Sequence, residues 1–76
     1  MTEIKLGTYK HYKGRKYEVI GIGHHNETLE EMIIYKALYN SKEFGDQALW
    51  IRPKNMFMEK VTYEGQKVDR FEYIKK

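Results

Sequence analysis

The sequence predicts a mainly β protein in which five or six short antiparallel strands close into a small barrel. The chain has 76 residues, enough for one domain spanning residues 1–76. Short runs of β-branched and aromatic residues alternate with turn-forming positions such as Gly14, Gly45 and Gly65. A closed sheet would also remove the exposed edges that a small open sheet carries.

A β-hairpin is expected over residues 8–23. Tyr9 and Tyr12 precede Gly14, and a β-branched run that begins at Tyr17 follows it. Glycine adopts positive φ at little cost, so a glycine between two such runs indicates a tight connection between two strands.

Residues 28–40 allow two interpretations. Thr28, followed three residues later by Glu31, is a capping-box pattern that would begin a helix. Alternating apolar residues along 31–39 would instead form a strand that is covered mainly on one side. Periodicity does not decide between the two.

The sequence of residues 40–74 predicts a loop, a strand, one helical turn and a hairpin. The loop covers residues 40–47, where Asn, Ser, Gly and Asp gather. The strand at 48–52 ends at Pro53, which lacks the N–H needed to continue a ladder. The helical turn and the hairpin follow at residues 53–57 and 60–74.

Eleven aromatic residues (seven Tyr, three Phe and one Trp) supply large side chains for a core and argue against disorder. We expect eight side chains to be mostly buried: Tyr17, Val19, Ile33, Tyr35, Leu49, Ile51, Phe57 and Phe71.

Composition excludes several classes of site. With no cysteine, the chain has no disulfide, no thiolate zinc site and no cysteine nucleophile. It carries no phosphate-binding loop, nucleophile elbow, catalytic carboxylate pair or glycine-rich fingerprint, and no cofactor is expected. Neither a membrane span nor the apolar stretch of a signal peptide is present, so a cytoplasmic location and no membrane partner are expected.

The net charge of +3 is unevenly distributed along the chain. Residues 1–17 hold five basic residues and one Glu, and residues 60–76 hold five basic and three acidic residues. Residues 18–31 hold four Glu and no Lys or Arg. This distribution could provide a surface for anions, although a solvated face gives the same pattern.

Five stretches, taken together, resemble a known family. They are Gly7-Thr8-Tyr9-Lys10-His11-Tyr12-Lys13-Gly14, His24-His25-Asn26-Glu27-Thr28-Leu29-Glu30, Ile34-Tyr35-Lys36-Ala37-Leu38-Tyr39, Leu49-Trp50-Ile51-Arg52-Pro53-Lys54-Asn55-Met56-Phe57 and Arg70-Phe71-Glu72. In this order and spacing they resemble the small bacterial family called domain of unknown function 1653. Where that family usually shows Arg-His-Ser-Glu-Thr, this chain reads His-His-Asn-Glu-Thr at 24–28.

The resemblance implies a stand-alone bacterial protein with a compact SH3-like β-barrel. It also favours a loop followed by a strand for residues 28–40. The family name brings no established activity.

One candidate site is the loop that holds His25, Glu27 and Thr28. A histidine near a carboxylate can act as an acid–base pair or contact a ligand. With His11 and His24 the loop could offer ligands to a metal, but adjacent histidines at a strand end point apart, so no metal site is expected. Alternatively, Glu27 and Thr28 only hold the loop in shape by bonding backbone amides.

Two arginines in apolar surroundings, Arg52 and Arg70, are the other candidates. A guanidinium close to buried groups is expected to have a carboxylate, phosphate or aromatic partner. Internal ion pairs, such as Arg52 with Glu27, are one interpretation, and an anion-binding pair beside His25 is the other.

Three functions are compatible with these residues, and no catalytic residue is assigned. The first is a non-catalytic module that binds a protein partner or a small anionic ligand. The second is an RNA or single-stranded DNA binder, since the basic ends and many tyrosines could contact phosphates and stack on bases. The third is an enzyme that uses His25 and Glu27. This function is the least favoured, because the chain is small and has no cofactor motif.

Overall fold

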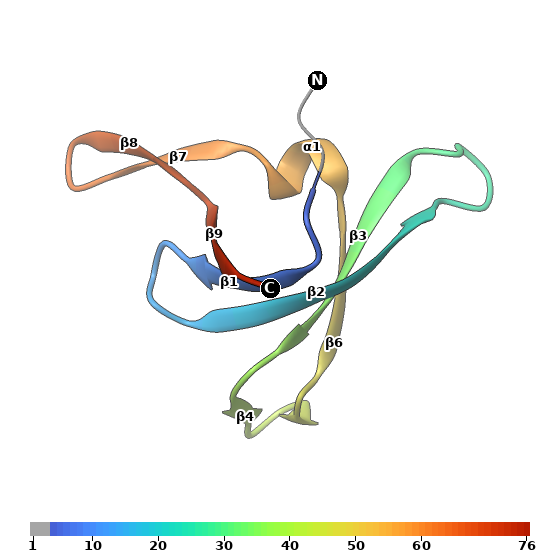
Figure 1. Ribbon diagram of the computed structural model, residues 1–76, viewed down its shortest axis with the longest axis horizontal. Helices are drawn as coiled ribbons and strands as arrows, with labels where there is room; N and C mark the ends of the chain where they lie inside the picture. Colours follow the sequence, from blue (N-terminus) through green and yellow to red (C-terminus); the bar gives the residue numbers. More distant parts are fainter. Residues whose placement is uncertain (1–3) are drawn as a thin grey trace.

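A curled, five-stranded antiparallel sheet forms most of the structure (Figure 1). The computed structural model describes residues 4–76. The strands of this sheet are β1 (Gly7–His11), β2 (Lys16–His24), β3 (Glu31–Ala37), β6 (Leu49–Pro53) and β9 (Phe71–Lys75), in the order β6-β3-β2-β1-β9. The expected mainly β fold is therefore confirmed.

Three smaller elements complete the chain. The hairpin of β4 (Asn40–Ser41) and β5 (Gly45–Asp46) joins β3 to β6, and the hairpin of β7 (Lys60–Tyr63) and β8 (Gln66–Asp69) precedes β9. The single helical turn, α1 (Lys54–Phe57), follows β6 as the sequence predicts.

The sheet does not close into the expected barrel. Within residues 4–76, no hydrogen-bonded pairing joins its two end strands, β6 and β9. Pro53 ends β6, and α1 then places Phe57 against Phe71 of β9, with ring centroids 4.2 Å apart and the rings parallel. Side-chain packing thus covers the opening where backbone pairing would have closed a barrel. The likeness to an SH3-like barrel, which the family resemblance implies, stays a prediction.

The expected first hairpin is confirmed as the β1–β2 pair, in which Tyr9 lies opposite Tyr17. Its turn is tight because the Gly14 N–H donates to the carbonyl of His11 at 2.7 Å, with Gly14 at φ 108°. That positive φ accounts for the glycine at this position.

The ambiguous segment forms a loop followed by a strand. Instead of beginning a helix, Thr28 accepts a hydrogen bond from the Glu30 N–H at 3.2 Å, and Leu29 has φ 63°. Residues 31–37 then form β3, which pairs with both β2 and β6. Two ladders satisfy the backbone groups of this segment, so sheet formation outweighs the local helix signal.

A bulge interrupts β2. Val19 lies opposite Tyr35 and Gly21 lies opposite Ile34, so Ile20 is an extra residue without a partner in the register. Such a bulge increases the local bend and twist of a strand. It also shifts the alternation of faces, so that Val19 and Ile22 share one side of the sheet.

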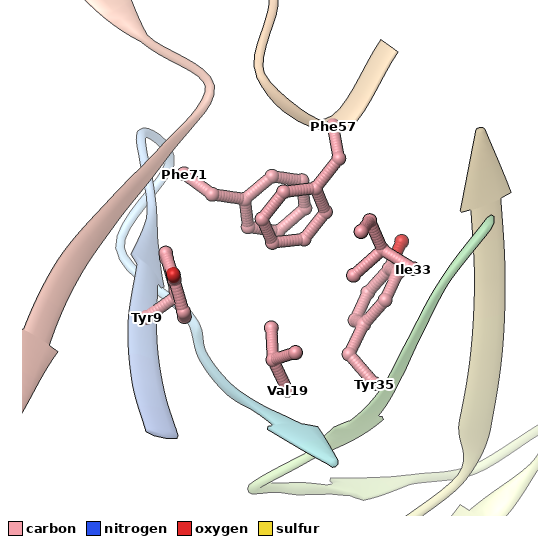
Figure 2. Close-up of a cluster of buried hydrophobic side chains, with 6 residues drawn as sticks. All are labelled: Tyr9, Val19, Ile33, Tyr35, Phe57 and Phe71. Carbon is pink, nitrogen blue, oxygen red and sulfur yellow. The ribbon is translucent and has the colours of Figure 1, made fainter. Parts of the chain in front are cut away.

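The core lies on the concave side of the sheet (Figure 2). The side chains shown point toward one another from four strands and α1; they are Tyr9, Val19, Ile33, Tyr35, Phe57 and Phe71. Five of the eight expected core residues are thus buried, and Tyr17 packs against this cluster while half-buried.

The expected burial of Leu49 and Ile51 is wrong. Their exposed fractions are 64% and 65%. Trp50 lies opposite Tyr35, and Arg52 lies opposite Ile33, both of which are buried core residues. The inner face of β6 therefore carries Trp50 and Arg52, and the two aliphatic side chains face outward.

Candidate functional site

The loop at 25–30 uses its polar side chains to hold its own backbone. His25 Nδ1 accepts hydrogen bonds from the N–H groups of Glu27 (3.1 Å) and Thr28 (3.3 Å). The backbone adds a bond from the His25 N–H to the carbonyl of Glu30 at 2.8 Å. The loop-shaping role expected of Glu27 and Thr28 is thus played by His25 and Thr28.

The expected pairing of Arg52 with Glu27 is wrong. Within residues 4–76, no ion pair joins these two side chains. The loop that carries Glu27 extends beyond the paired ends of β2 and β3 at His24 and Glu31 (Figure 1), whereas Arg52 lies opposite Ile33 within the sheet. Within residues 4–76, no side-chain hydrogen bond joins His25 or Thr28 to Arg52 either.

Arg70 forms the internal ion pair that was one interpretation of its position. Its Nη2 lies 2.9 Å from Oε1 of Glu59, and the Arg70 backbone N–H donates to the carbonyl of Glu59 at 3.1 Å. The side chain of Arg70 is 21% exposed, so water screens this pair only in part. Its Nε is buried and has no partner within residues 4–76.

Arg52 is half-buried and contacts aromatic side chains instead of an acid. Its Nε donates to the hydroxyl of Tyr35 at 3.3 Å, and its guanidinium carbon lies 5.8 Å from the ring centroid of Phe71. In the described part of the chain, no carboxylate lies within ion-pair distance of Arg52.

His11 lies next to these arginines, at the end of β1 opposite Phe71. Its ring meets that of Phe71 edge to face at 5.0 Å. Burial lowers the pKa of His11 below its ordinary value of 6.5, and the charges of Arg70, Arg52 and Lys13 lower it further. His11 is therefore neutral at pH 7.

The tautomer of His11 follows from its hydrogen bond. Nδ1 accepts the N–H of Lys13 at 3.1 Å. A neutral imidazole that accepts at Nδ1 carries its proton on Nε2, which can donate to a ligand. We call His11, Arg52 and Arg70, with the aromatic residues Tyr35 and Phe71 that contact Arg52, the cationic cluster.

A pair of tyrosines adjoins the cationic cluster. The hydroxyl oxygens of Tyr17 and Tyr39 are 2.8 Å apart, and the guanidinium of Arg15 lies 4.3 Å from the ring centroid of Tyr39. Burial, followed by the hydrogen bond with Tyr39, raises the pKa of Tyr17. The Tyr17 hydroxyl therefore stays protonated and adds no negative charge beside the cluster.

The sequence found three members of the cluster and missed the aromatic ones. Phe71 was expected only as a core residue, and Tyr35 as a core residue or as one of the tyrosines that could stack on a base, yet each contacts Arg52. The signal that could have revealed the arrangement is the alternation in β6, where Trp50 and Arg52 share one face.

Comparison with known proteins now gives the family. A family model described as "Protein of unknown function (DUF1653)" matches residues 7–73. The chain belongs to this family. The resemblance inferred from the five sequence stretches is thus confirmed.

A solved member of the DUF1653 family has the same fold. The crystal structure of a family protein from Bordetella bronchiseptica superposes with a TM-score of 0.84 at 28% sequence identity. The match covers 95% of this chain and 88% of that one. No curated protein matches the chain.

This DUF1653 protein separates the residues that were considered as metal ligands. His11 lies at the end of β1, next to the β1–β2 turn, whereas His24, His25 and Glu27 lie at the opposite end of β2. Within residues 4–76, no three side chains of the ligating types come together.

No helix in this range is long and apolar enough to cross a membrane. The cytoplasmic location stays a prediction.

A groove gives His11 access to solvent in this family member. The groove has a volume of about 300 Å³ and lies between β1 and the β7–β8 hairpin. Its lining includes Tyr12 and Tyr63, whose rings meet edge to face, and the acids Asp69 and Glu72. Asp69 is already paired with Lys60 at 3.1 Å.

Proposed function

We propose that this protein is a non-catalytic binding module whose cationic cluster recognises an anionic group on a protein partner or a small ligand. The observation that carries the proposal is the half-buried guanidinium of Arg52, which contacts Tyr35 and Phe71 and has no acidic partner within residues 4–76. A partly desolvated cation without a counter-ion is stabilised when an anion binds.

The chemistry of the cluster favours carboxylate or phosphate. The fork of an arginine matches either group in a bidentate arrangement, and the Nε of Arg52 is held by Tyr35. This contact orients the guanidinium and leaves its terminal nitrogens available. His11 can add a donor from Nε2 without adding a charge.

Titration with inorganic phosphate tests the proposal. We expect phosphate to shift the NMR signals of the Arg52 guanidinium and the His11 ring in a saturable way. Arg52→Gln should abolish the response of His11, because the principal donor is lost. Lys42→Gln is the matched control, since it removes the same charge from an exposed position in the β4–β5 loop.

Two results would contradict the proposal. One is the absence of any saturable shift at either side chain of the cluster. The other is an equal loss of response in Lys42→Gln and Arg52→Gln, which would indicate general charge screening. Thermal melting of both variants checks that each is folded.

Single-stranded nucleic acid is the second candidate, and one feature favours it. Lys13 lies 5.8 Å from the ring centroid of Tyr12, and Lys5 lies 5.2 Å from that of Tyr73, so cations accompany tyrosines at the surface. Such pairs can hold both a phosphate and a base. In contrast, Tyr9 is buried in the core and is therefore not available to stack on a base.

Salt dependence separates the two candidates. A short single-stranded RNA should bind with an affinity that falls steeply as salt rises, if several phosphates are contacted. Loss of RNA binding in Lys13→Gln, with no effect of Arg52→Gln, would favour the nucleic-acid function. Binding that depends on Arg52 alone would favour the cationic cluster.

A further inference from the structure

Among residues 4–76, strand β6 has one backbone edge without a partner strand. It pairs with β3 on one side and is the end strand of the sheet. The Ala37 N–H donates to the carbonyl of Ala48 at 2.8 Å, which makes these two residues a hydrogen-bonded pair. Hydrogen-bonded and non-hydrogen-bonded pairs alternate along an antiparallel ladder. Leu49 and Ile51 therefore direct their N–H and C=O groups away from β3.

These edge groups are free in the described part of the chain. No turn or loop hydrogen bond within residues 4–76 involves the backbone of Leu49 or Ile51. Pro53 occupies the next position with this orientation, where its missing N–H breaks no bond to β3. The edge thus offers two donors and two acceptors, at Leu49 and Ile51, because the carbonyl of Pro53 accepts the first hydrogen bond of α1.

The two faces of this edge differ in chemistry. On the outer face, Leu49 and Ile51 are 64% and 65% exposed. On the inner face, Arg52 presents a guanidinium that has no acidic partner within residues 4–76. An exposed apolar edge strand is a template for pairing with another extended chain.

We propose that the free edge of β6 binds an extended acidic peptide as an added β-strand. The peptide backbone pairs with Leu49 and Ile51, its apolar side chains pack on their exposed side chains, and its carboxylates face Arg52. Alternation in the peptide places the apolar and acidic side chains on opposite faces. This inference rests on the proposed function, because Arg52 is the anion-binding residue in both.

Charge and size favour a peptide over the other possible occupants. A second copy paired through β6 would bring two uncompensated Arg52 guanidiniums into one small interface. A five-residue edge also buries much less than the roughly 800 Å² per partner of a stable dimer. A nucleic acid lacks the regularly spaced N–H donors that the carbonyls of Leu49 and Ile51 require.

The test uses the acetylated, amidated peptide TEVEVET and amide hydrogen exchange of the full chain. In the free protein the amides of Leu49 and Ile51 should exchange rapidly, and the peptide should protect both. The neutral peptide TQVQVQT should bind more weakly. N-methylation of both valines should abolish protection, because in this register the valine N–H groups donate to β6.

Matched variants locate the binding surface. Ile51→Glu should weaken peptide binding roughly ten-fold or more, since it removes an apolar contact and repels the acidic peptide. Leu29→Glu makes the same chemical change in the β2–β3 loop, where Leu29 is 70% exposed, and should leave binding within about two-fold. Arg52→Gln should lower the affinity for TEVEVET to that for TQVQVQT.

The outcomes separate this inference from the proposed function. A phosphate response at Arg52 without peptide protection of Leu49 and Ile51 would overturn strand addition alone. If TEVEVET and TQVQVQT protect the amides of Leu49 and Ile51 equally, and Arg52→Gln leaves this protection unchanged, the preference for an acidic peptide and the role of Arg52 are overturned. A peptide-independent dimer that protects the same amides, detected by sedimentation, would overturn the peptide in favour of a second copy.

Discussion

His11 connects burial, charge and ligand binding at a single side chain. Its pKa lies below 6.5 because burial disfavours the imidazolium, and Arg70, Arg52 and Lys13 add repulsion. Arg52→Gln should therefore raise the pKa of His11 toward 6.5. An NMR titration of the imidazole ring measures this shift. An unchanged pKa would place Arg52 too far from His11 to act with it.

The same group makes stability depend on pH. Between the lowered pKa of folded His11 and the unfolded value of 6.5, the unfolded chain binds more protons than the folded one. The contribution of His11 to the free energy of unfolding is thus retained above pH 6.5 and falls as the pH drops toward the folded pKa. Denaturant unfolding across this pH range, compared with His11→Gln, measures the difference.

Phe57 and Leu49 test which large side chains hold the core. Phe57 is 1% exposed and packs on Phe71, so Phe57→Ala should lower the free energy of unfolding by about 3–5 kcal/mol. Leu49→Ala removes an exposed side chain and should cost less than about 1 kcal/mol. Urea unfolding compares the two variants. If both variants lost the same free energy of unfolding, Leu49 would be a core residue and the aliphatic face of β6 would point inward.

At the level of elements, the bulge in β2 makes a prediction about chain length. Without Ile20, Val19 can still pair with Tyr35 and Gly21 with Ile34, so deleting Ile20 should give a regular ladder with the same core face. Deleting Glu18 instead forces the residues on one side of the deletion out of register. A one-residue shift moves side chains to the opposite face.

Unfolding curves and cross-strand amide contacts distinguish these two deletions. The variant without Ile20 should keep a cooperative transition and the contact between Val19 and Tyr35. The variant without Glu18 should be far less stable. Similar unfolding of both variants would show that the bend supplied by the bulge matters more than the register.

The elements that could be predicted from the sequence are those whose signals are local. Gly14 marked the first turn and Pro53 the end of β6, because each acts through its own backbone geometry. The strand at 31–37 needed the family resemblance, since its pairing on both edges is a long-range property. The residues of β6 that face the core were predicted wrongly. Leu49 and Ile51 are apolar and flank Trp50, which suggested that these two side chains are buried.

At the scale of the whole molecule, topology decides which candidate residues meet. His11 and Arg52 are far apart in the sequence but share the concave face, because β1 and β6 belong to one curled sheet. His25 and Glu27 looked equally suitable for chemistry, yet they lie in a loop beyond the end of the β2–β3 pair (Figure 1). Local pattern identified residue types suited to anions, and only the strand order could bring them together.

The position of Trp50 gives the molecule a built-in optical reporter. It is the single tryptophan of the chain, it lies two residues before Arg52 on β6, and its indole packs edge to face on Phe44 at 5.1 Å. Its Nε1 is buried and has no partner within residues 4–76. A strand added to β6 would change the surroundings of this indole, so the emission of unlabelled protein would follow occupancy of the edge directly.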